Sequence, residues 1–250
     1  MRITTVLNQK GGTGKSTTAH ALATGLTRRG LKTLIIDADP QSNITYTTGA
    51  DTQENGLYEL LRGIVDAPGA IQHTSQGDII ASSLDLAGAD MEFTQIGREN
   101  LLREALEPIK DNYSHIIIDS PPALGILSVN ALTASGDVVI PACADIYSLQ
   151  GLNQLLDTIN RVRKYSNPAL NIAGILITRK GKDTIATRAM TEQIQRKASA
   201  AGVNLYGAAI REATAIQQAQ ILQRSIFEHA PTANVAADYN AFIDEYLKQE

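Results

Sequence analysis

Near the start of the chain stands a glycine-rich loop, Lys10-Gly11-Gly12-Thr13-Gly14-Lys15-Ser16-Thr17. An apolar, β-branched run over residues 3–7 precedes it, and residues 16–29 repeat small and apolar side chains at helical spacing. Glycines let the main chain approach a phosphate closely, and a helix N-terminus presents free N–H groups and the positive end of its dipole. The sequence therefore predicts a phosphate-binding loop between a strand and a helix.

Two lysines belong to this loop. Lys15 followed by Ser16 is the P-loop arrangement, in which the lysine contacts the β- and γ-phosphates and the hydroxyl ligates Mg²⁺. An ordinary P-loop does not require Lys10. Its side chain could be solvated, or it could reach the phosphates of a neighbouring subunit and neutralise charge that develops during phosphoryl transfer. We therefore expect ATP and Mg²⁺ as cofactors, Lys10 and Lys15 as candidate catalytic residues, and residues 11–17 as the nucleotide-binding loop.

A second apolar run ends in a pair of acids. Asp37 and Asp39 follow residues 33–36, and ligands of open α/β sheets bind at the C-terminal ends of strands. Asp39 is well placed to orient or activate an attacking water, which makes it a candidate catalytic residue, and Asp37 to hold the Mg²⁺ shell or the loop. Either acid could instead serve only as a turn-forming residue before Pro40.

A third acid, Asp119, ends the apolar run 116–118 and has the Walker B position for water-mediated Mg²⁺ binding. Together with Ser16 and Asp37 it forms the predicted metal site. Two prolines then stiffen the chain. The loop up to Asn130 could therefore respond to the γ-phosphate as a switch.

Apolar runs rich in β-branched residues recur along the chain, and helix-like segments follow them. The runs cover residues 3–7, 33–36, 79–81, 115–118, 138–141 and 172–177, and long helices are expected at 16–29, 149–164, 184–201 and 232–248. Strands that alternate with helices predict a parallel sheet, and runs that are apolar at every position predict strands covered on both faces. The predicted fold class is α/β, a doubly wound, mostly parallel sheet with helices on both faces, in one domain over residues 1–250. Residues 38–76 have no readable pattern.

Composition limits the setting of the protein. The single cysteine, Cys143, excludes an internal disulfide and a thiolate metal cluster, and buried apolar filler is its expected role. No apolar run approaches the ~20 residues of a membrane span, and the N-terminus is too polar for a signal peptide. We expect a soluble, cytoplasmic protein that does not bind membranes.

Charge is distributed unevenly. Residues 161–224 hold eleven Lys or Arg against three acids, a net charge of +8 in a chain whose formal net charge is -4. Such asymmetry is compatible with a basic face that binds nucleic acid and equally with solvated helix faces.

Four segments together carry a family resemblance. They are the loop with its two preceding residues (8–17), Asp37-Ala38-Asp39-Pro40-Gln41-Ser42-Asn43, Ile117-Ile118-Asp119-Ser120-Pro121-Pro122-Ala123-Leu124-Gly125 and Ile210-Arg211-Glu212. They resemble the ParA family of DNA-partitioning ATPases within the MinD/ParA group, whereas the loop alone indicates only the broader deviant Walker A superfamily. The resemblance implies a cycle in which ATP closes a sandwich homodimer and Lys10 of each subunit contacts the nucleotide in the other. It also implies that the dimer binds double-stranded DNA non-specifically until a ParB-type centromere-binding partner stimulates hydrolysis and release.

The same resemblance implies roles for individual residues. Asp39 matches the catalytic acid, Asp119 the Walker B acid, and Thr178 and Arg179 the loop near the adenine. The chain resembles the short members of the family, which lack an N-terminal helix-turn-helix, because its first expected strand begins at residue 2. Residues 213–216, Ala-Thr-Ala-Ile, depart from the more usual basic or Asn-containing segment, so DNA contacts there stay open.

The resemblance favours the basic segment as a DNA face and a nucleoid-associated location. Lys and Arg contacts to phosphates are independent of base sequence and sensitive to salt, as non-specific binding requires. The candidate DNA-binding residues are Arg179, Lys180, Lys182, Arg188, Arg196, Lys197, Arg211 and Arg224.

Other P-loop proteins are the alternatives. A MinD-like membrane-cycling ATPase needs a basic amphipathic C-terminal helix, whereas residues 238–250 hold four acids and one base. The Asp-Pro-Gln and Asp-Ser-Pro-Pro motifs argue against a metabolic ligase resembling dethiobiotin synthetase. A nitrogenase-reductase-like electron carrier would need more cysteines, and a bacterial tyrosine kinase a tyrosine-rich tail. A nucleotide-gated DNA scaffold with negligible turnover is the non-enzymatic alternative.

Overall fold

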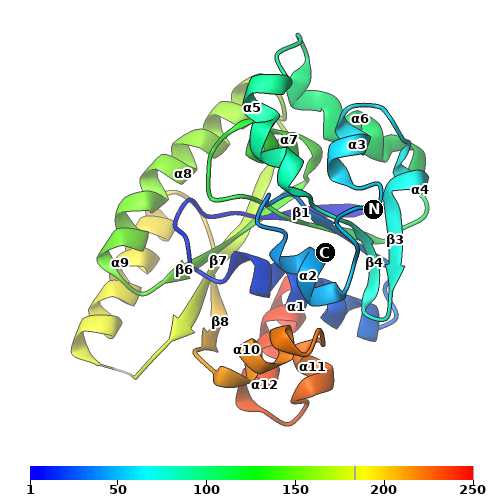
Figure 1. Ribbon diagram of the computed structural model, residues 1–250. Coiled ribbons are helices and arrows are strands. Elements are labelled where there is room, and N and C mark those ends of the chain that lie inside the picture. The colour runs from blue at the N-terminus through cyan, green and yellow to red at the C-terminus, as the bar shows by residue number, and fades with distance from the viewer. Residues whose placement is uncertain (183, 250) are drawn as a thin grey trace.

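The computed structural model describes residues 1–182 and 184–249. Within them lies an eight-stranded sheet with the strand order β3-β4-β2-β5-β1-β6-β7-β8 (Figure 1). Neighbouring strands are parallel, except that β3 and β4 form an antiparallel hairpin at one edge. The strands are β1 (Arg2–Val6), β2 (Thr33–Asp37), β3 (Ile71–Thr74), β4 (Gly77–Ile80), β5 (His115–Asp119), β6 (Asp137–Cys143), β7 (Asn171–Lys180) and β8 (Leu205–Arg211).

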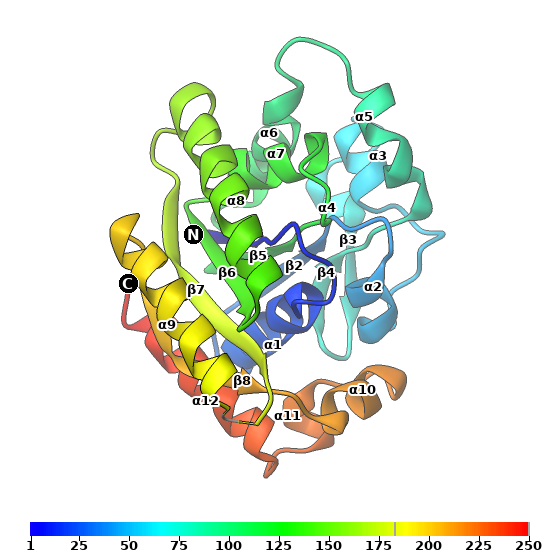
Figure 2. The ribbon, with the colours of Figure 1, turned by 90° about the vertical axis from the view of Figure 1, so that its left-hand side faces the viewer.

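Helices cover both faces of the sheet, as Figure 1 and Figure 2 show from two sides. One face packs against α1 (Lys15–Arg28), α2 (Asn43–Thr48), α10 (Thr214–Ile221), α11 (Ile226–His229) and α12 (Asn234–Leu247). The other packs against α3 (Leu57–Leu61), α4 (Ala67–Ala70), α5 (Ala89–Glu92), α6 (Leu101–Leu106), α7 (Ile126–Ala134), α8 (Ile146–Tyr165) and α9 (Ile185–Ala200). Short 3-10 helices lie at η1 (Leu84–Gly88), η2 (Arg98–Asn100) and η3 (Glu107–Ile109). The predicted α/β class is thus confirmed.

Strand β5 illustrates why the central strands are apolar at every position. Ile117 packs into the core on the α1 face, whereas Ile116 and Ile118 pack into the core on the opposite face. All three side chains are fully buried. Since β5 lies between β2 and β1, Asp119 is in register with Asp37 on one side and with the end of β1 on the other. The strand ends that carry the acids and the glycine-rich loop therefore meet at one edge of the sheet.

The structure differs from the sequence prediction in several elements. Helix α7 begins at Ile126, so the loop after Asp119 ends at Gly125 and not at Asn130. The first N–H of this helix is satisfied from a distant segment, because Ile126 N–H donates to the Asp90 carboxylate at 2.6 Å. Strands β3 and β8 are missing from the prediction. The positions of β3 are all partly or fully exposed, and those of β8 mix buried and exposed irregularly. The unreadable residues 38–76 contain α2, α3, α4 and β3.

The C-terminal helix α12 is part of the core. Phe242 and Tyr246 are fully buried, and the Tyr246 hydroxyl is 2.7 Å from the Thr4 hydroxyl of β1. The Arg2 guanidinium lies 4.0 Å from the centroid of the Tyr246 ring and pairs with Asp137 at 2.8 Å. The apolar face of α12 is therefore covered by the sheet. No helix in the described part of the chain is long and apolar enough to cross a membrane.

A buried polar contact joins α1 to the β3–β4 hairpin. His20 Nε2 lies 2.9 Å from Gln76 Oε1, and the Gln76 amide nitrogen donates to the carbonyls of Thr47 and Gln223. Because that nitrogen is already used as a donor, the oxygen accepts and His20 carries its proton on Nε2. Burial lowers the pKa of His20 to about 4, so the native protein holds this imidazole neutral.

The buried His20 makes stability fall in acid. The unfolded imidazole takes up a proton below its ordinary pKa of about 6.5, whereas the folded one does so only near 4. Lowering the pH from about 7 to about 5 should therefore cost about 2 kcal/mol of unfolding free energy through this group. His20→Gln keeps a donor and should remove that part of the pH dependence in urea titrations.

The matched control is His229→Gln at the partly exposed end of α11. Other buried groups titrate in the same range, so the comparison is between variant and wild type at each pH. An unchanged pH dependence in His20→Gln would contradict the assignment.

Candidate functional site

The glycine-rich loop has a backbone that favours glycine at two positions. Gly12 and Gly14 adopt the left-handed conformation with φ of 74° and 80°, which side chains with a Cβ rarely adopt. Gly14 is the N-cap of α1, and the helix begins at Lys15. The Thr178 hydroxyl of β7 donates to the Thr13 carbonyl at 2.7 Å and ties the loop to the sheet. The loop thus presents the N-terminus of α1 to the edge of the sheet.

A cavity of about 730 Å³ opens in front of this N-terminus. It is large enough for a phosphate tail with a hydrated cation. Its walls come from the loop, the chain after β2, helix α2, the loop after β5 and helix α10. They include Gly11, Gly12, Gly14, Lys15, Ser16, Thr17, Asp39, Asn43, Tyr46, Thr47, Pro122, Gln217, Gln220 and Ile221.

Lys15 is a buried cation at the floor of this cavity. Its ammonium has one long hydrogen bond, to the Lys10 carbonyl at 3.4 Å. Burial lowers the pKa of Lys15, while the nearby Asp119 and Asp39 raise it in partial compensation. Because the buried Lys15 ammonium has little hydrogen bonding within the chain, it is well suited to bind an anionic ligand.

Asp119 is the acid whose surroundings fit a bound cation. Both carboxylate oxygens are buried and make no hydrogen bond of normal geometry, although the Ser16 hydroxyl is close enough to favour the charged form. Burial, followed by the charge of Asp37, raises the pKa of Asp119 well above its usual range. Since buried polar atoms without partners are rare, these oxygens and the Ser16 hydroxyl fit a hydrated Mg²⁺.

The described residues contain no cluster of three His, Cys, Asp or Glu that could hold a metal alone. Mg²⁺ does not need one, because it usually keeps several waters and takes other ligands from phosphates. Ser16 and Asp119 are therefore sufficient protein partners for a nucleotide-bound ion.

Asp37 has different surroundings. One oxygen accepts from the Asp39 N–H at 3.2 Å, and the other accepts from both the N–H and the hydroxyl of Thr45, at 2.9 and 2.8 Å. Burial raises its pKa to about 6. We predicted that Asp37 holds either the Mg²⁺ shell or the loop, and its hydrogen bonds go to the loop. Asp39, in contrast, lines the cavity.

Lys10 lies outside its own phosphate cavity. Its ammonium pairs with Asp145 at 2.5 Å and lies 5.6 Å from the centroid of the Tyr147 ring. Both partners belong to the start of α8, where Asp145 is the N-cap. The two lysines of one loop thus face different parts of the molecule. No local sequence pattern indicates the pairing of Lys10 with Asp145.

A smaller cavity of about 240 Å³ adjoins the loop on the β7–β8 side. Arg179, which has a left-handed backbone with φ of 51°, donates to the Gly12 carbonyl at 3.1 Å and pairs with Glu212 at 2.6 Å. Thr178 and Arg179 thus lie next to the glycine-rich loop, and their contact with the adenine stays a prediction. Helix α10 adds Ile216, Gln217 and Gln220 to the walls.

The α10 residues were not predicted as site residues. The Gln220 amide donates to the Thr17 hydroxyl at 3.2 Å, which places α10 directly beside the P-loop. The polar residues of α10 have the same pattern as those of any solvated helix. The sequence alone therefore does not indicate that they belong to the site.

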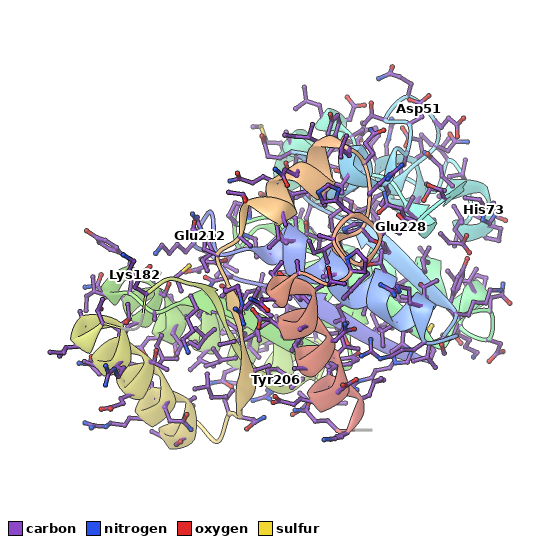
Figure 3. All side chains as sticks on the ribbon, turned by 90° about the horizontal axis from the view of Figure 1, so that it is seen from below. Asp51, His73, Lys182, Tyr206, Glu212 and Glu228 are labelled. Atoms are coloured by element: carbon purple, nitrogen blue, oxygen red, sulfur yellow. The ribbon has the colours of Figure 1, made fainter. Side chains whose placement is uncertain are left out.

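The predicted DNA-binding residues fall into separate places. Arg179, Lys180, Arg188 and Arg196 line one cavity of about 770 Å³ together with Lys10. Lys182 is exposed and follows soon after the end of β7 (Figure 3). We call the four residues from β7 and α9, namely Arg179, Lys180, Arg188 and Arg196, the basic surface.

Three other predicted DNA contacts do not line the cavity of about 770 Å³. Lys197 donates to the Leu149 carbonyl of α8 at 2.9 Å. Arg211 forms two hydrogen bonds with the Asp238 carboxylate, at 2.7 and 2.8 Å. Arg224 lies in the turn between α10 and α11. Of these three, Arg211 is nevertheless next to the basic surface, because it lines smaller cavities with Arg179 and with Lys180.

A strand, a phosphate-binding loop and a helix N-terminus, with a strand-end acid beside them on a parallel sheet, define the class of P-loop ATPases. Comparisons with known proteins identify the branch. A family model described as an AAA domain matches residues 1–172. The sporulation initiation inhibitor protein Soj of Bacillus subtilis is 43% identical over 182 residues, 71% of this chain and 72% of that protein.

Two further relatives agree with this. The chromosome partitioning protein ParA of Caulobacter vibrioides is 42% identical over 187 residues, 71% of this chain and 69% of that protein. The chromosome-partitioning ATPase Soj of Thermus thermophilus is 35% identical over 240 residues, 96% of this chain and 93% of that protein. The chain therefore belongs to the ParA family of partitioning ATPases.

Solved structures support the nucleotide site. A plasmid partition protein of Borrelia burgdorferi bound to AMPPNP has a TM-score of 0.85 at 26% identity, covering 100% of this chain and 99% of that one. Cobyrinic acid a,c-diamide synthase of Mycobacterium smegmatis, solved with an ATP analogue and magnesium, has a TM-score of 0.87 at 29% identity, covering 100% and 95%. The predictions of an ATPase with ATP and Mg²⁺ as cofactors are thus confirmed.

Proposed function

We propose that the protein is a DNA-partition ATPase whose ATP-bound sandwich dimer binds DNA non-specifically and leaves it when a ParB-type partner stimulates hydrolysis. Residues 1–250 would act as one ATPase domain in the cytoplasm, associated with the nucleoid. The observation that carries the proposal is the position of Lys10 on the P-loop, outside its own phosphate cavity and beside the basic surface. The residues proposed to contact the nucleotide, the second subunit and DNA therefore lie next to one another.

The residues of the phosphate cavity are proposed to have separate roles in ATP hydrolysis. Bound Mg²⁺–ATP supplies the phosphoryl group and a cation that neutralises its charge. The loop N–H groups and Lys15 bind the phosphates, and Ser16 and Asp119 hold the hydrated ion. Asp39, at the wall of the same cavity, orients the attacking water.

Lys10 is proposed to act on the nucleotide of the second subunit. In the isolated chain its pair with Asp145 is partly exposed, with 30% and 36% of the two side chains accessible. Such pairs contribute at most about 1 kcal/mol. The pair therefore opposes only weakly the movement of Lys10 to a partner's phosphates.

The basic surface is proposed to contact DNA phosphates. If its four cations each neutralise one phosphate, affinity for duplex DNA should fall by about 10-fold when the salt concentration doubles. Fluorescence anisotropy with random-sequence duplex DNA should show this binding with ATP and much less with ADP. Equal retention on DNA with ATP, ADP or no nucleotide would contradict the proposal.

A pair of double variants tests the location of the contacts. Lys180→Ala with Arg196→Ala should reduce the salt slope by about 2. Arg161→Ala with Lys164→Ala removes the same charge at the exposed end of α8 and should leave the slope unchanged. Equal losses in both double variants would mean that overall charge, and not the basic surface, governs binding.

The alternative functions have less support. A membrane-cycling ATPase needs a free amphipathic C-terminal helix, and the apolar side of α12 is buried in the core. A metabolic ligase is favoured only by the likeness to the synthase at 29% identity, whereas partitioning relatives reach 43%.

A further inference from the structure

Four residues behind the phosphate cavity form a closed ring of hydrogen bonds. Asp37 accepts from the Asp39 N–H on one oxygen and from Thr45 on the other. The Thr45 hydroxyl oxygen in turn accepts from the Ser82 N–H at 2.9 Å. The Ser82 hydroxyl closes the ring by donating to the Asp39 carbonyl at 2.6 Å. Because a carboxylate only accepts and an N–H only donates, every donor in the ring is determined.

The ring joins elements that are distant in sequence. Asp37 ends β2, Thr45 lies in α2, and Ser82 follows β4, which is paired in parallel with β2. Asp37 and Thr45 are fully buried, and the exposed fractions of Ser82 and Asp39 are 1% and 6%. Water therefore offers no ready replacement for a lost bond.

The ring holds the main chain of Asp39 on both sides. Its N–H donates to Asp37 and its carbonyl accepts from Ser82. The Asp39 carboxylate stays outside the ring, where one oxygen accepts from the Gln41 N–H at 3.1 Å. The backbone is thus fixed while the side chain faces the phosphate cavity.

We propose that Thr45 and Ser82 are positioning residues that hold Asp39 at the reacting phosphate, Thr45 through Asp37 and Ser82 by its direct bond to the Asp39 carbonyl. This rests on the proposed role of Asp39. A carboxylate has about four acceptor sites, and three hydrogen bonds already occupy Asp37, one from the Asp39 N–H and two from Thr45 of α2. Asp119 has none of normal geometry. Asp37 therefore serves the loop, and Asp119 is the acid that remains for the metal.

The ring should affect turnover more than nucleotide binding. Neither Thr45 nor Ser82 lines the phosphate cavity, so the ATP contacts survive their loss. A displacement of about 1 Å at a reacting group can cost on the order of 100-fold in rate. We therefore expect kcat to fall by about 10- to 100-fold with the KM for ATP nearly constant.

The main test is Thr45→Val, which removes the hydroxyl at constant shape. ATP hydrolysis by the full chain is measured with duplex DNA, beside Thr45→Ser, which keeps the hydroxyl and should restore kcat. Thr48→Val is the matched control, because that buried hydroxyl of the same helix donates within α2, to the Ile44 and Thr45 carbonyls, and not to the ring. Wild-type kcat in Thr45→Val, or an equal loss in Thr48→Val, would overturn the proposal.

A second readout does not depend on activity. Hydrogen exchange of the Asp39 amide without nucleotide should be faster in Thr45→Val than in Thr48→Val. Should Thr45→Val not fold, Ser82→Ala breaks the ring at one bond and should lower kcat in the same way; wild-type turnover there would overturn the proposal. Asp39→Ala distinguishes failure of the positioning proposal from failure of the proposed role of Asp39. Wild-type hydrolysis in that variant would refute the role of Asp39 itself.

Discussion

Replacing Lys15 with alanine is expected to weaken ATP binding severely and to lower hydrolysis with it. The Lys15 ammonium is buried and faces Asp119 and Asp39, so its loss leaves two carboxylates uncompensated at a site that must accept a polyanion. Truncating one partner of a buried charge contact costs about 2–5 kcal/mol, which weakens binding by roughly 30- to 3,000-fold. Titration with a fluorescent ATP analogue measures this directly.

Lys110→Ala is the matched control for Lys15→Ala. Lys110 is exposed and pairs with Glu107, three residues before it. Both lie outside the P-loop and the phosphate cavity, so the loss of Lys110 should leave ATP affinity unchanged. Wild-type affinity in Lys15→Ala would remove this lysine from the nucleotide site.

Replacing Lys10 with alanine should impair ATP hydrolysis and leave ATP binding nearly unchanged, unlike Lys15→Ala. ATP binding should stay within a few-fold of wild type, because this ammonium pairs with Asp145 and lies outside its own phosphate cavity. Hydrolysis in the presence of duplex DNA should fall by at least about 100-fold, since cations supplied across an interface contribute about 10³–10⁵ to phosphoryl transfer. Parallel titrations and turnover measurements separate the two effects.

Asp145→Asn is the matched control for Lys10→Ala. It breaks the same ion pair from the other side but leaves Lys10 in place, and asparagine also caps helices well. Turnover in Asp145→Asn should equal or exceed that of wild type. Normal turnover in Lys10→Ala, or the same loss in both variants, would refute the action of Lys10 on a second subunit.

The sequence was sufficient to predict the class of ATPase and the grouping of the candidate site residues. A P-loop is a local motif, and its strand, glycines and helix follow one another in the chain. Acids at strand ends are equally local, and parallel strands bring their carboxyl ends to one edge of a sheet. Lys15, Asp39 and Asp119 could therefore be placed near one another without knowledge of the strand order.

The contacts that arrange the site could not be predicted. Ser82 follows β4, and its hydroxyl reaches Asp39 only because β4 lies beside β2. The pairing of Lys10 with Asp145 depends similarly on β6 lying beside β1. Strand order is a property of tertiary packing, and local patterns carry little information about it. Gln220 has the further difficulty that an amide on a polar helix has no distinctive pattern.

Strand β1 and helix α12 hold the two ends of the chain together, with Arg2 between Tyr246 and Asp137. This has a practical meaning for following the protein in living cells. A fluorescent label attached after α12 leaves the stacked ring and its ion pair intact, whereas shortening the chain into α12 would uncover the first strand and the core beneath it. Loss of localisation in a chain shortened into α12 would therefore report unfolding, and studies of movement should keep α12 intact.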